Sequence, residues 1–223
     1  MLDGGKAVPF ADILAGRWDA YIKAYFTSLK AYPHRATVRF AHEPNGSRYP
    51  WSPTRANPSC TSPAQYVQVW RHLSAIKQAV GAANTSLEFC VANADSGGVP
   101  FEAFWPGSGY VQVAAFDAYC GYSGGYISPH DTLASTYARL AALTTSPIWV
   151  SELGCRDPSR NDGVPADPSW TKAQWYGQLF ALTEFPRIKH VKLLQRSEGA
   201  RLAGQLLGCR DGTAAWTPTR RPR

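Results

Sequence analysis

Two glutamates each follow a short apolar run that breaks at a proline or a glycine. Glu43 lies in the segment Thr-Val-Arg-Phe-Ala-His-Glu-Pro-Asn-Gly, and Glu152 lies in Pro-Ile-Trp-Val-Ser-Glu-Leu-Gly. Such β-branched and aromatic runs are typical of buried parallel strands, which would present each carboxylate at a C-terminal strand end. Two carboxylates that meet at one substrate bond can act as general acid and nucleophile, which is the chemistry of glycoside hydrolysis.

The spacing of the two glutamates agrees with positions across the mouth of a closed barrel. Glu43 and Glu152 are 109 residues apart, and a (β/α)8 barrel uses roughly 30 to 35 residues per strand–helix unit. Three units therefore separate them, which places them on facing strands. The residues Arg39, His42 and Asn45 lie next to Glu43 in the chain and could orient it and raise its pKa.

Several aromatic residues lie on predicted loops or at a strand end. Tyr49 and Trp51 follow the first glutamate, and Trp105 begins a Trp-Pro-Gly segment. They could form a flat apolar surface for a sugar, although packing over the barrel explains each of them equally well. Tyr119 ends the strand that precedes Glu152 and could donate a hydrogen bond to it, but a lone tyrosine is more often a packing residue.

Two other chemistries are disfavoured. Residues 121–125 match the G-x-S-x-G motif, which would make Ser123 the nucleophile of a serine hydrolase. Four residues intervene before a helix can begin, so we interpret this stretch as a glycine-rich loop. His42 and Glu43 do not form the zinc motif because no second histidine follows at the required spacing, and the five cysteines show no metal-ligand spacing. We expect no metal and no cofactor.

Length and composition are those of one globular domain. The 223 residues are 44% apolar and 13% aromatic, which is enough for a sizeable core. No apolar run approaches the ~18 residues of a membrane span. The net charge of +7 comes wholly from residues 187–223, which hold nine Lys and Arg and two Asp and Glu. Such a tail can bind nucleic acid or an anionic membrane, but we expect neither partner, and we expect a monomer.

The order of predicted elements favours an α/β fold with a parallel sheet. Helical periodicity or apolar runs predict helices over 10–32, 63–80, 131–143 and 172–183, and strands over 37–41, 86–92, 111–118 and 148–151. Ser62 is a candidate cap for the second helix. Cys120 and Cys155 each follow one of two neighbouring strands, where a disulfide is geometrically plausible.

A set of motifs resembles glycoside hydrolase family 26. The motifs are ordered and specific, cover about residues 10 to 192, and span 12–19, 39–46, 49–51, 70–72, 105–107, 117–119, 148–154 and 185–188. The resemblance implies a (β/α)8 barrel and a retaining mechanism, most often that of an endo-β-1,4-mannanase, with other β-glucan or xylan specificities in the family. It implies a polysaccharide or oligosaccharide substrate and an extracellular parent enzyme, although this chain has no signal peptide.

The resemblance also implies residue roles. Glu43 corresponds to the general acid/base at the end of the fourth strand, and Glu152 corresponds to the nucleophile at the end of the seventh. The candidate substrate-binding residues are Arg39, His42, Asn45, Trp51, Trp105 and Tyr119.

Both ends depart from the family pattern. Only about 40 residues precede Glu43, whereas three strand–helix units need roughly 90 to 100. We therefore expect a partial barrel in which strands 4 to 7 or 8 are present and strands 1 to 3 are missing. From Leu193 onward, the same nucleotides read one base later can encode the family motif, so we expect a frameshift there. Residues 1–192 would be a partial glycosidase domain with weak or no activity, and 193–223 an out-of-frame basic tail. The alternative is a catalytically inactive carbohydrate-binding fragment.

Overall fold

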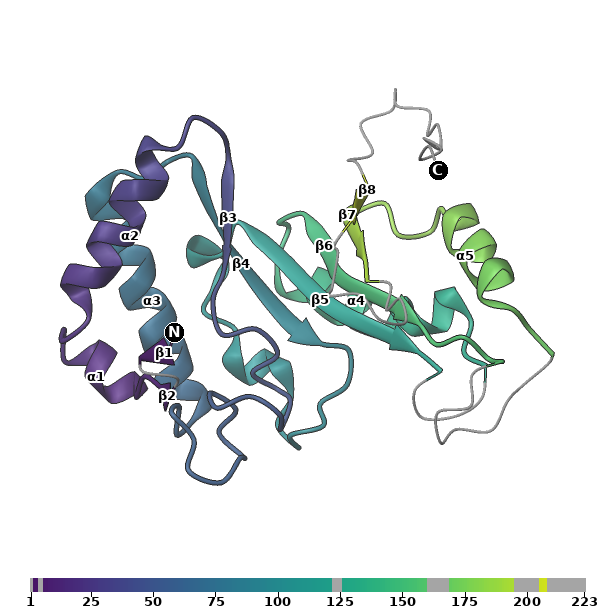
Figure 1. Ribbon diagram of the computed structural model, residues 1–223, viewed down its shortest axis with the longest axis horizontal. Coiled ribbons are helices and arrows are strands. Elements are labelled where there is room, and N and C mark those ends of the chain that lie inside the picture. The colour runs from purple at the N-terminus through teal and green to yellow at the C-terminus, as the bar shows by residue number, and fades with distance from the viewer. Residues whose placement is uncertain (1, 4–5, 122–125, 160–168, 195–204, 208–223) are drawn as a thin grey trace, which may run out of the picture.

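A six-stranded sheet is the main element of the computed structural model (Figure 1), which describes residues 2–3, 6–121, 126–159, 169–194 and 205–207. Its strand order is β3-β4-β5-β6-β7-β8. Strands β3 to β7 are parallel to one another, and β8 pairs antiparallel with β7. The strands are β3 (Ala36–Arg39), β4 (Thr85–Ala92), β5 (Val113–Cys120), β6 (Ile148–Cys155), β7 (Ile188–Leu193) and β8 (Gln205–Leu207). The short strands β1 (Leu2–Asp3) and β2 (Lys6–Ala7) form a separate antiparallel pair.

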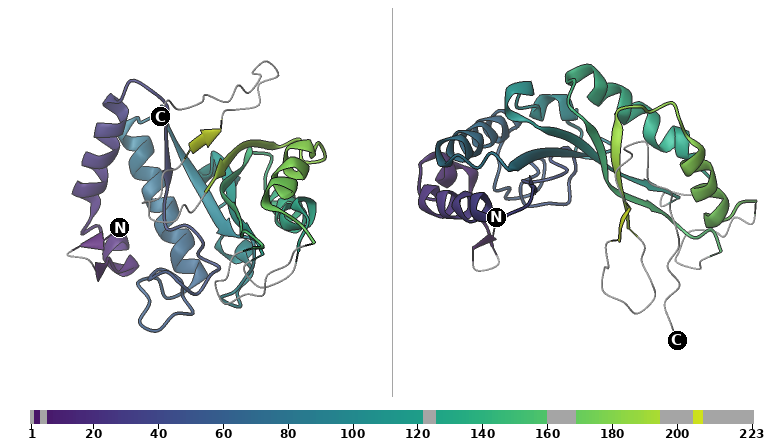
Figure 2. Two further views of the ribbon diagram at one scale, coloured as in Figure 1. Left: turned by 45° about the vertical axis from the view of Figure 1, so that its right-hand side comes forward. Right: turned by 90° about the horizontal axis from the view of Figure 1, so that it is seen from above.

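The helices cover one face of this sheet. They are α1 (Phe10–Leu14), α2 (Asp19–Ala31), α3 (Pro63–Val80), α4 (Pro129–Leu143) and α5 (Lys172–Ala181), with the 3-10 turns η1 (Phe101–Phe104) and η2 (Ser108–Tyr110). The right-hand view of Figure 2 shows the sheet curved like part of a barrel wall, with the helices on its convex side. Five parallel strands with helices outside confirm the expectation of a partial (β/α)8 barrel. None of the helices within the described ranges is long and apolar enough to cross a bilayer.

The hydrophobic core lies between the sheet and these helices. Tyr66 and Trp70 of α3 are fully buried, and the ring of Trp70 lies 5.7 Å from that of Phe89 on β4. Because successive strand residues point to opposite faces, the neighbours of Phe89 point to the concave face. There, Glu88 accepts a hydrogen bond of 2.6 Å from Ser151 of β6. The convex face is therefore apolar, whereas the concave face holds polar side chains.

One predicted helix is two helices in the structure. Residues 10–32 were expected to be continuous, but α1 ends near Gly16, which has a φ of +74°. The backbone N–H of Gly16 bonds to the carbonyl of Ile13, a helix-terminating arrangement that glycine favours because it has no Cβ. The predicted spacing still describes the core, since Ile13, Ile22 and Phe26 are buried.

Helix α3 begins and ends as its sequence predicts. The hydroxyl of Ser62 accepts a hydrogen bond from the backbone N–H of Gln65, and Pro63 occupies the first turn, where its missing N–H costs nothing. Gly81 ends the helix in the left-handed conformation. These local signals set the first and last residues of α3.

Cys120 and Cys155 face each other at the carboxyl ends of β5 and β6. They are paired in register, and both are buried. The structure contains them as free thiols, rather than as the disulfide that the sequence made plausible. The prediction that these two residues are neighbours is confirmed.

Candidate active site

Arg39 is the centre of a charged cluster on the concave face of the sheet. It is the last residue of β3, and its Nη1 donates to Oδ1 and Oδ2 of Asp117 at 3.1 and 3.3 Å. Its Nη2 donates to Oε1 of Glu152 at 2.7 Å. Since β4 and β5 lie between β3 and β6, the guanidinium reaches across two strands. One arginine therefore fixes two carboxylates that come from different strands.

Glu152 has a second donor in Tyr119. The phenol of Tyr119 donates to Oε2 of Glu152 at 2.6 Å, so each oxygen of this carboxylate accepts one short hydrogen bond. Burial alone would raise the pKa of Glu152, but the hydrogen bonds from Tyr119 and Arg39 outweigh it and leave this pKa below its ordinary value. Glu152 is therefore held ionised and in one orientation.

Glu43 has the opposite electrostatic environment. Burial raises its pKa, the negative charge of Glu152 raises it further, and Arg48 and Arg39 only partly oppose this. The backbone of Glu43 has a φ of +51°, which is unfavourable for a side chain with a Cβ, and its N–H is held by the carbonyl of Cys90 at 2.8 Å. Two carboxyl groups with pKa values driven apart are the arrangement in which one is an acid and the other a base or nucleophile.

His42, Tyr49 and Trp51 form an aromatic group beside the two glutamates. The rings of Tyr49 and Trp51 are stacked, with centroids 4.8 Å apart and an interplanar angle of 4°, and the ring of His42 lies 4.4 Å from that of Tyr49. The indole N–H of Trp51 donates to the carbonyl of His42 at 2.7 Å. Burial and the charge of Arg39 lower the pKa of His42 to about 4, so its imidazole is neutral at neutral pH.

His42, Asp117 and Glu152 also have the residue types of a metal site. One potential ligand atom from each lies within 4.8 Å of the others. However, the guanidinium of Arg39 already bonds to both carboxylates. A fixed positive charge there disfavours a second cation, and the donor set fits an ion-paired cluster better than a metal centre.

Asn45 lies beneath the cluster instead of in it. The residue is 1% exposed. Its Nδ2 donates to the carbonyls of Ala92 and Ala94 and to Oδ1 of Asp95, while its Oδ1 accepts from the N–H of Ala92. This side chain fastens the loop after β3 to the end of β4, and in this structure all its hydrogen-bonding groups face protein partners.

Trp105 is not brought to the cluster. Its ring lies edge-on to Phe89 at 5.2 Å, and Phe89 points to the convex face, where α3 covers the sheet. The structure thus brings together Arg39, His42, Glu43, Trp51, Tyr119 and Glu152, and it places Asn45 and Trp105 elsewhere. Ser123, the alternative nucleophile, lies outside the described residues.

Asp117 is the cluster residue that we did not predict as part of the site. Its side chain is fully buried, and burial raises its pKa to about 8 although Arg39 opposes this shift. A signal was present, because Asp117 is the one charged residue in the apolar run from Val111 to Cys120. An acidic group in a buried strand is rare unless it is paired.

The structure is similar to solved β-mannanases of glycoside hydrolase family 26. The TM-score is 0.55 to a mannanase of Bacillus subtilis, at 16% identity, with coverage of 82% of this chain and 51% of the other. It is 0.53 to a family 26 β-mannanase of Bacteroides ovatus, at 17% identity, with coverage of 82% and 52%. This chain has the fold of about half of a family 26 barrel. The resemblance predicted from the sequence motifs is confirmed at the level of fold.

Sequence comparison gives a related result. Endoglucanase H of Acetivibrio thermocellus is 28% identical over 179 residues, which cover 76% of this chain and 18% of that protein. No family model matches the chain. The chain spans about half the length of the solved family 26 structures above and less than a fifth of this relative.

Proposed function

We propose that this chain carries part of the catalytic barrel of a retaining glycoside hydrolase that acts on a β-glycan. One observation supports this above all: Glu43 and Glu152 lie within electrostatic reach of each other and have pKa values shifted in opposite directions. Glu43 is suited to remain protonated, and Glu152 is suited to remain ionised. A retaining glycosidase needs such a pair.

In the proposed mechanism, an ionised oxygen of Glu152 attacks the anomeric carbon. Glu43 gives its proton to the glycosidic oxygen as the bond from that oxygen to the sugar breaks, which leaves a sugar ester on Glu152. Glu43, now ionised, then removes a proton from water, whose oxygen attacks the same carbon and releases Glu152. This two-step reaction requires the two carboxyl groups to lie about 5 to 5.5 Å apart.

Tyr119 and Arg39 act as positioning residues for the nucleophile. Their hydrogen bonds hold both oxygens of Glu152. As negative charge leaves Glu152 during the attack, these donors lose part of their attraction, and they regain it when the ester is hydrolysed. We assign His42 and Trp51 to the sugar-binding wall, with Tyr49 stacked on Trp51 as its support.

The finer proposal is an endo-β-1,4-mannanase or a closely related β-glycanase that degrades plant polysaccharide. The names of the structural neighbours support mannan, and the name of the sequence relative supports a glucan. A polymeric substrate does not enter cells, so we propose that the parent protein acts outside the cell. We extend this proposal to the activity and substrates of any longer protein that contains this chain.

Covalent trapping is the sharpest test, because it does not require rapid turnover. A 2-deoxy-2-fluoro-β-mannosyl fluoride reacts with the nucleophile, releases fluoride without help from an acid, and leaves a stable sugar ester. We expect mass spectrometry to find this ester on Glu152 in the wild type and in Glu43→Gln, but not in Glu152→Gln. Glu184→Gln, at an exposed position, is the matched control. An ester on another residue, or no ester in any variant, would contradict the mechanism.

A second candidate function is carbohydrate binding without turnover. The specific observation that favours it is the edge position of β3 within the described sheet: the strand that carries Arg39 has a neighbour on one side only. A substrate on the concave face would then lack part of the barrel wall. Saturable binding of mannotetraose with no ester in the trapping experiment would support this function instead.

A further inference from the structure

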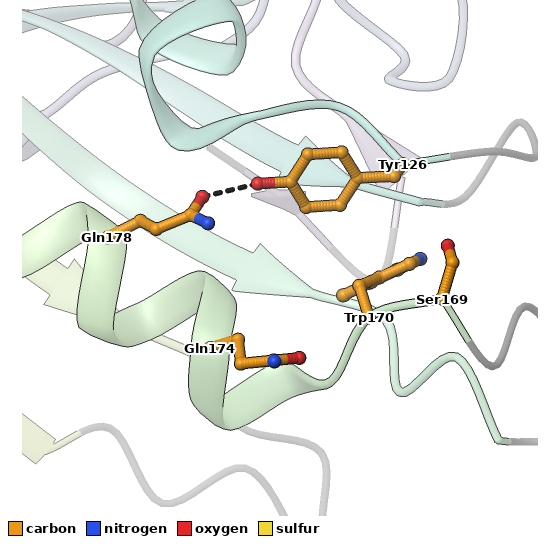
Figure 3. A pocket seen from close by; sticks show the side chains of 5 residues that line it. All are labelled: Tyr126, Ser169, Trp170, Gln174 and Gln178. Carbon is orange, nitrogen blue, oxygen red and sulfur yellow. Dashed lines mark hydrogen bonds between the residues drawn. The ribbon is translucent and has the colours of Figure 1, made fainter.

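A small pocket beside α5 has no part in the proposed reaction. It is lined by Tyr126, Ser169, Trp170, Gln174 and Gln178 and has a volume of about 270 Å³. Figure 3 shows the two aromatic rings on one side and the two glutamines of α5 on the other. We propose that this pocket binds one pyranose ring of a neutral glycan and is a second carbohydrate site on the protein.

The aromatic wall of the pocket is held in place by packing. Trp170 is 7% exposed, and its ring edge lies over Gly121, where an added Cβ would be 3.8 Å from two ring carbons. Tyr126 lies edge-on to Trp170 with centroids 5.4 Å apart, and it is 39% exposed. Tyr126 therefore supplies the aromatic surface that solvent can reach, and the buried Trp170 supports it. An exposed ring held in this way suits the apolar C–H face of a sugar.

The polar wall is oriented by hydrogen bonds to the carbonyl ends of the glutamines. Gln174 closes the capping box of α5, so its Oε1 accepts from the N–H of Thr171 at 2.8 Å. The Oε1 of Gln178 accepts from the phenol of Tyr126. Gln174 and Gln178 are four residues apart and lie on the same face of the helix. Within the described part of the chain, neither amide NH2 donates a hydrogen bond, so both can donate to a ligand.

These features select the class of ligand. The five lining residues include no charged side chain, which disfavours phosphate, carboxylate or cationic ligands. Sugar hydroxyls can accept from amide NH2 groups while the ring lies against an aromatic side chain. The volume of the pocket is slightly smaller than that of typical small-molecule pockets, which start at about 300 Å³. One sugar ring therefore fits better than an oligosaccharide.

The pocket is separate from the candidate active site. It shares no residue with the cluster of Arg39, Glu43 and Glu152. The choice of a glycan rests on the proposed function, and a second site would hold one part of a polymer while another part reaches the glutamates. The two sites can therefore be tested independently.

Nuclear magnetic resonance of indole N–H groups separates the two sites. Mannotetraose would be titrated into 15N-labelled Glu152→Gln protein, with the signals of Trp170 and Trp51 identified by their loss in Trp170→Phe and Trp51→Phe. The indole N–H of Trp170 is buried and has no hydrogen-bond partner among the described residues, so a sugar in the pocket should shift its signal through the changed environment of the indole ring. We expect a saturable shift at both tryptophans.

Variants of the polar wall complete the test. Gln178→Ala and Gln174→Ala should each raise the dissociation constant measured from the Trp170 signal at least tenfold. The dissociation constant measured from the Trp51 signal should stay unchanged. Gln78→Ala, at an exposed position of α3, should change neither. Far-UV circular dichroism verifies folding, and Tyr126→Ala provides a variant outside the helix.

Each outcome decides the proposal. A response at Trp51 without one at Trp170, or no response at either, overturns the second site. A response at Trp170 without one at Trp51 supports the second site and counts against the proposed function. A shift at Trp170 that persists unchanged in both glutamine variants and in Tyr126→Ala also overturns it, because the sugar would then bind elsewhere.

Discussion

Arg39 donates to Glu152 at 2.7 Å from the other side of two intervening strands. The same guanidinium bonds to Asp117 through its other terminal nitrogen. The side chain of Arg39 is 23% exposed and that of Asp117 is fully buried. This contact therefore determines both the orientation of the proposed nucleophile and the charge balance of the concave face.

Replacement of Arg39 by methionine should destabilise the protein. The buried carboxyl of Asp117 and the carboxylate of Glu152 would lose their shared cation, and removal of one partner from a buried pair costs about 3 to 5 kcal/mol. Chemical denaturation would measure this as a lower free energy of unfolding. Arg35→Met, at an exposed position, should change it by no more than about 0.5 kcal/mol. An equally small loss for Arg39→Met would show that the pair contributes little.

Replacement of Tyr119 by phenylalanine should raise the pKa of Glu152. The phenol bonds to the ionised form, and its loss favours protonation. The acid limb of activity should move to higher pH, because Glu152 must be ionised to attack. Carboxyl 13C resonances of labelled glutamate, assigned with Glu152→Gln, would measure the shift directly. Tyr25→Phe, on an exposed part of α2, should have no effect.

The hydrogen bond from Tyr119 to Glu152 should also affect how the stability of the protein depends on pH. The folded pKa of Glu152 lies below its ordinary value of 4.5, so ionised Glu152 stabilises the fold above about pH 4.5 and loses this effect as the pH falls through the folded pKa. Tyr119→Phe should reduce the stability difference between pH 7 and pH 3. If the difference is unchanged, the phenol does not control this group.

Gly154→Ala should disturb Tyr119 without removing it. Gly154 is paired with Tyr119 across β5 and β6, and an added Cβ would lie 2.9 Å from two carbons of the tyrosine ring. The ring must move, so the pKa of Glu152 should rise as in Tyr119→Phe, with a loss of stability of about 1 to 3 kcal/mol. Gly109→Ala, where an added Cβ meets no atom within 4 Å, is the matched control. An unchanged pKa in Gly154→Ala would mean that the ring adapts without losing its bond.

Asn45→Ala should loosen the loop that carries Glu43. The backbone groups of Ala92 and Ala94 would lose their buried partners, which costs about 1 to 3 kcal/mol for each group left unsatisfied. Thermal denaturation should show a lower midpoint, and amide hydrogen exchange should accelerate in residues 43–52. Ser47→Ala, at an exposed position of the same loop, should change neither. If amide hydrogen exchange in residues 43–52 is unchanged in Asn45→Ala, Asn45 does not anchor this loop.

Much of this arrangement could be predicted from local patterns. Apolar periodicity and the cap at Ser62 placed α3. Apolar runs placed Glu43 after β3 and Glu152 in β6, although β6 continues through Gly154 to Cys155 instead of ending there. These signals are local because helix and strand formation depend on neighbouring residues. The break at Gly16 was missed because apolar spacing continues through it.

Local sequence patterns did not predict the contacts between strands. The pairing of β5 with β6 shifts between Phe116 and Asp117, where Ser151 is extra, and this irregularity sets which face Glu152 uses. Trp105 resembled a loop residue that could bind sugar, yet it packs on Phe89 at the convex face. A side chain's face depends on register and bulges, which no single segment encodes.

By itself, the sequence determined the order of helices and strands, the family resemblance and the two glutamates, because each depends on residues adjacent in the chain. Only the tertiary structure decided that Arg39 joins Asp117 to Glu152 and that Asn45 lies beneath the site. It also assembled the pocket beside α5 from Tyr126 and four residues that follow more than forty positions later. Such contacts arise because curvature and register of the sheet bring distant side chains together.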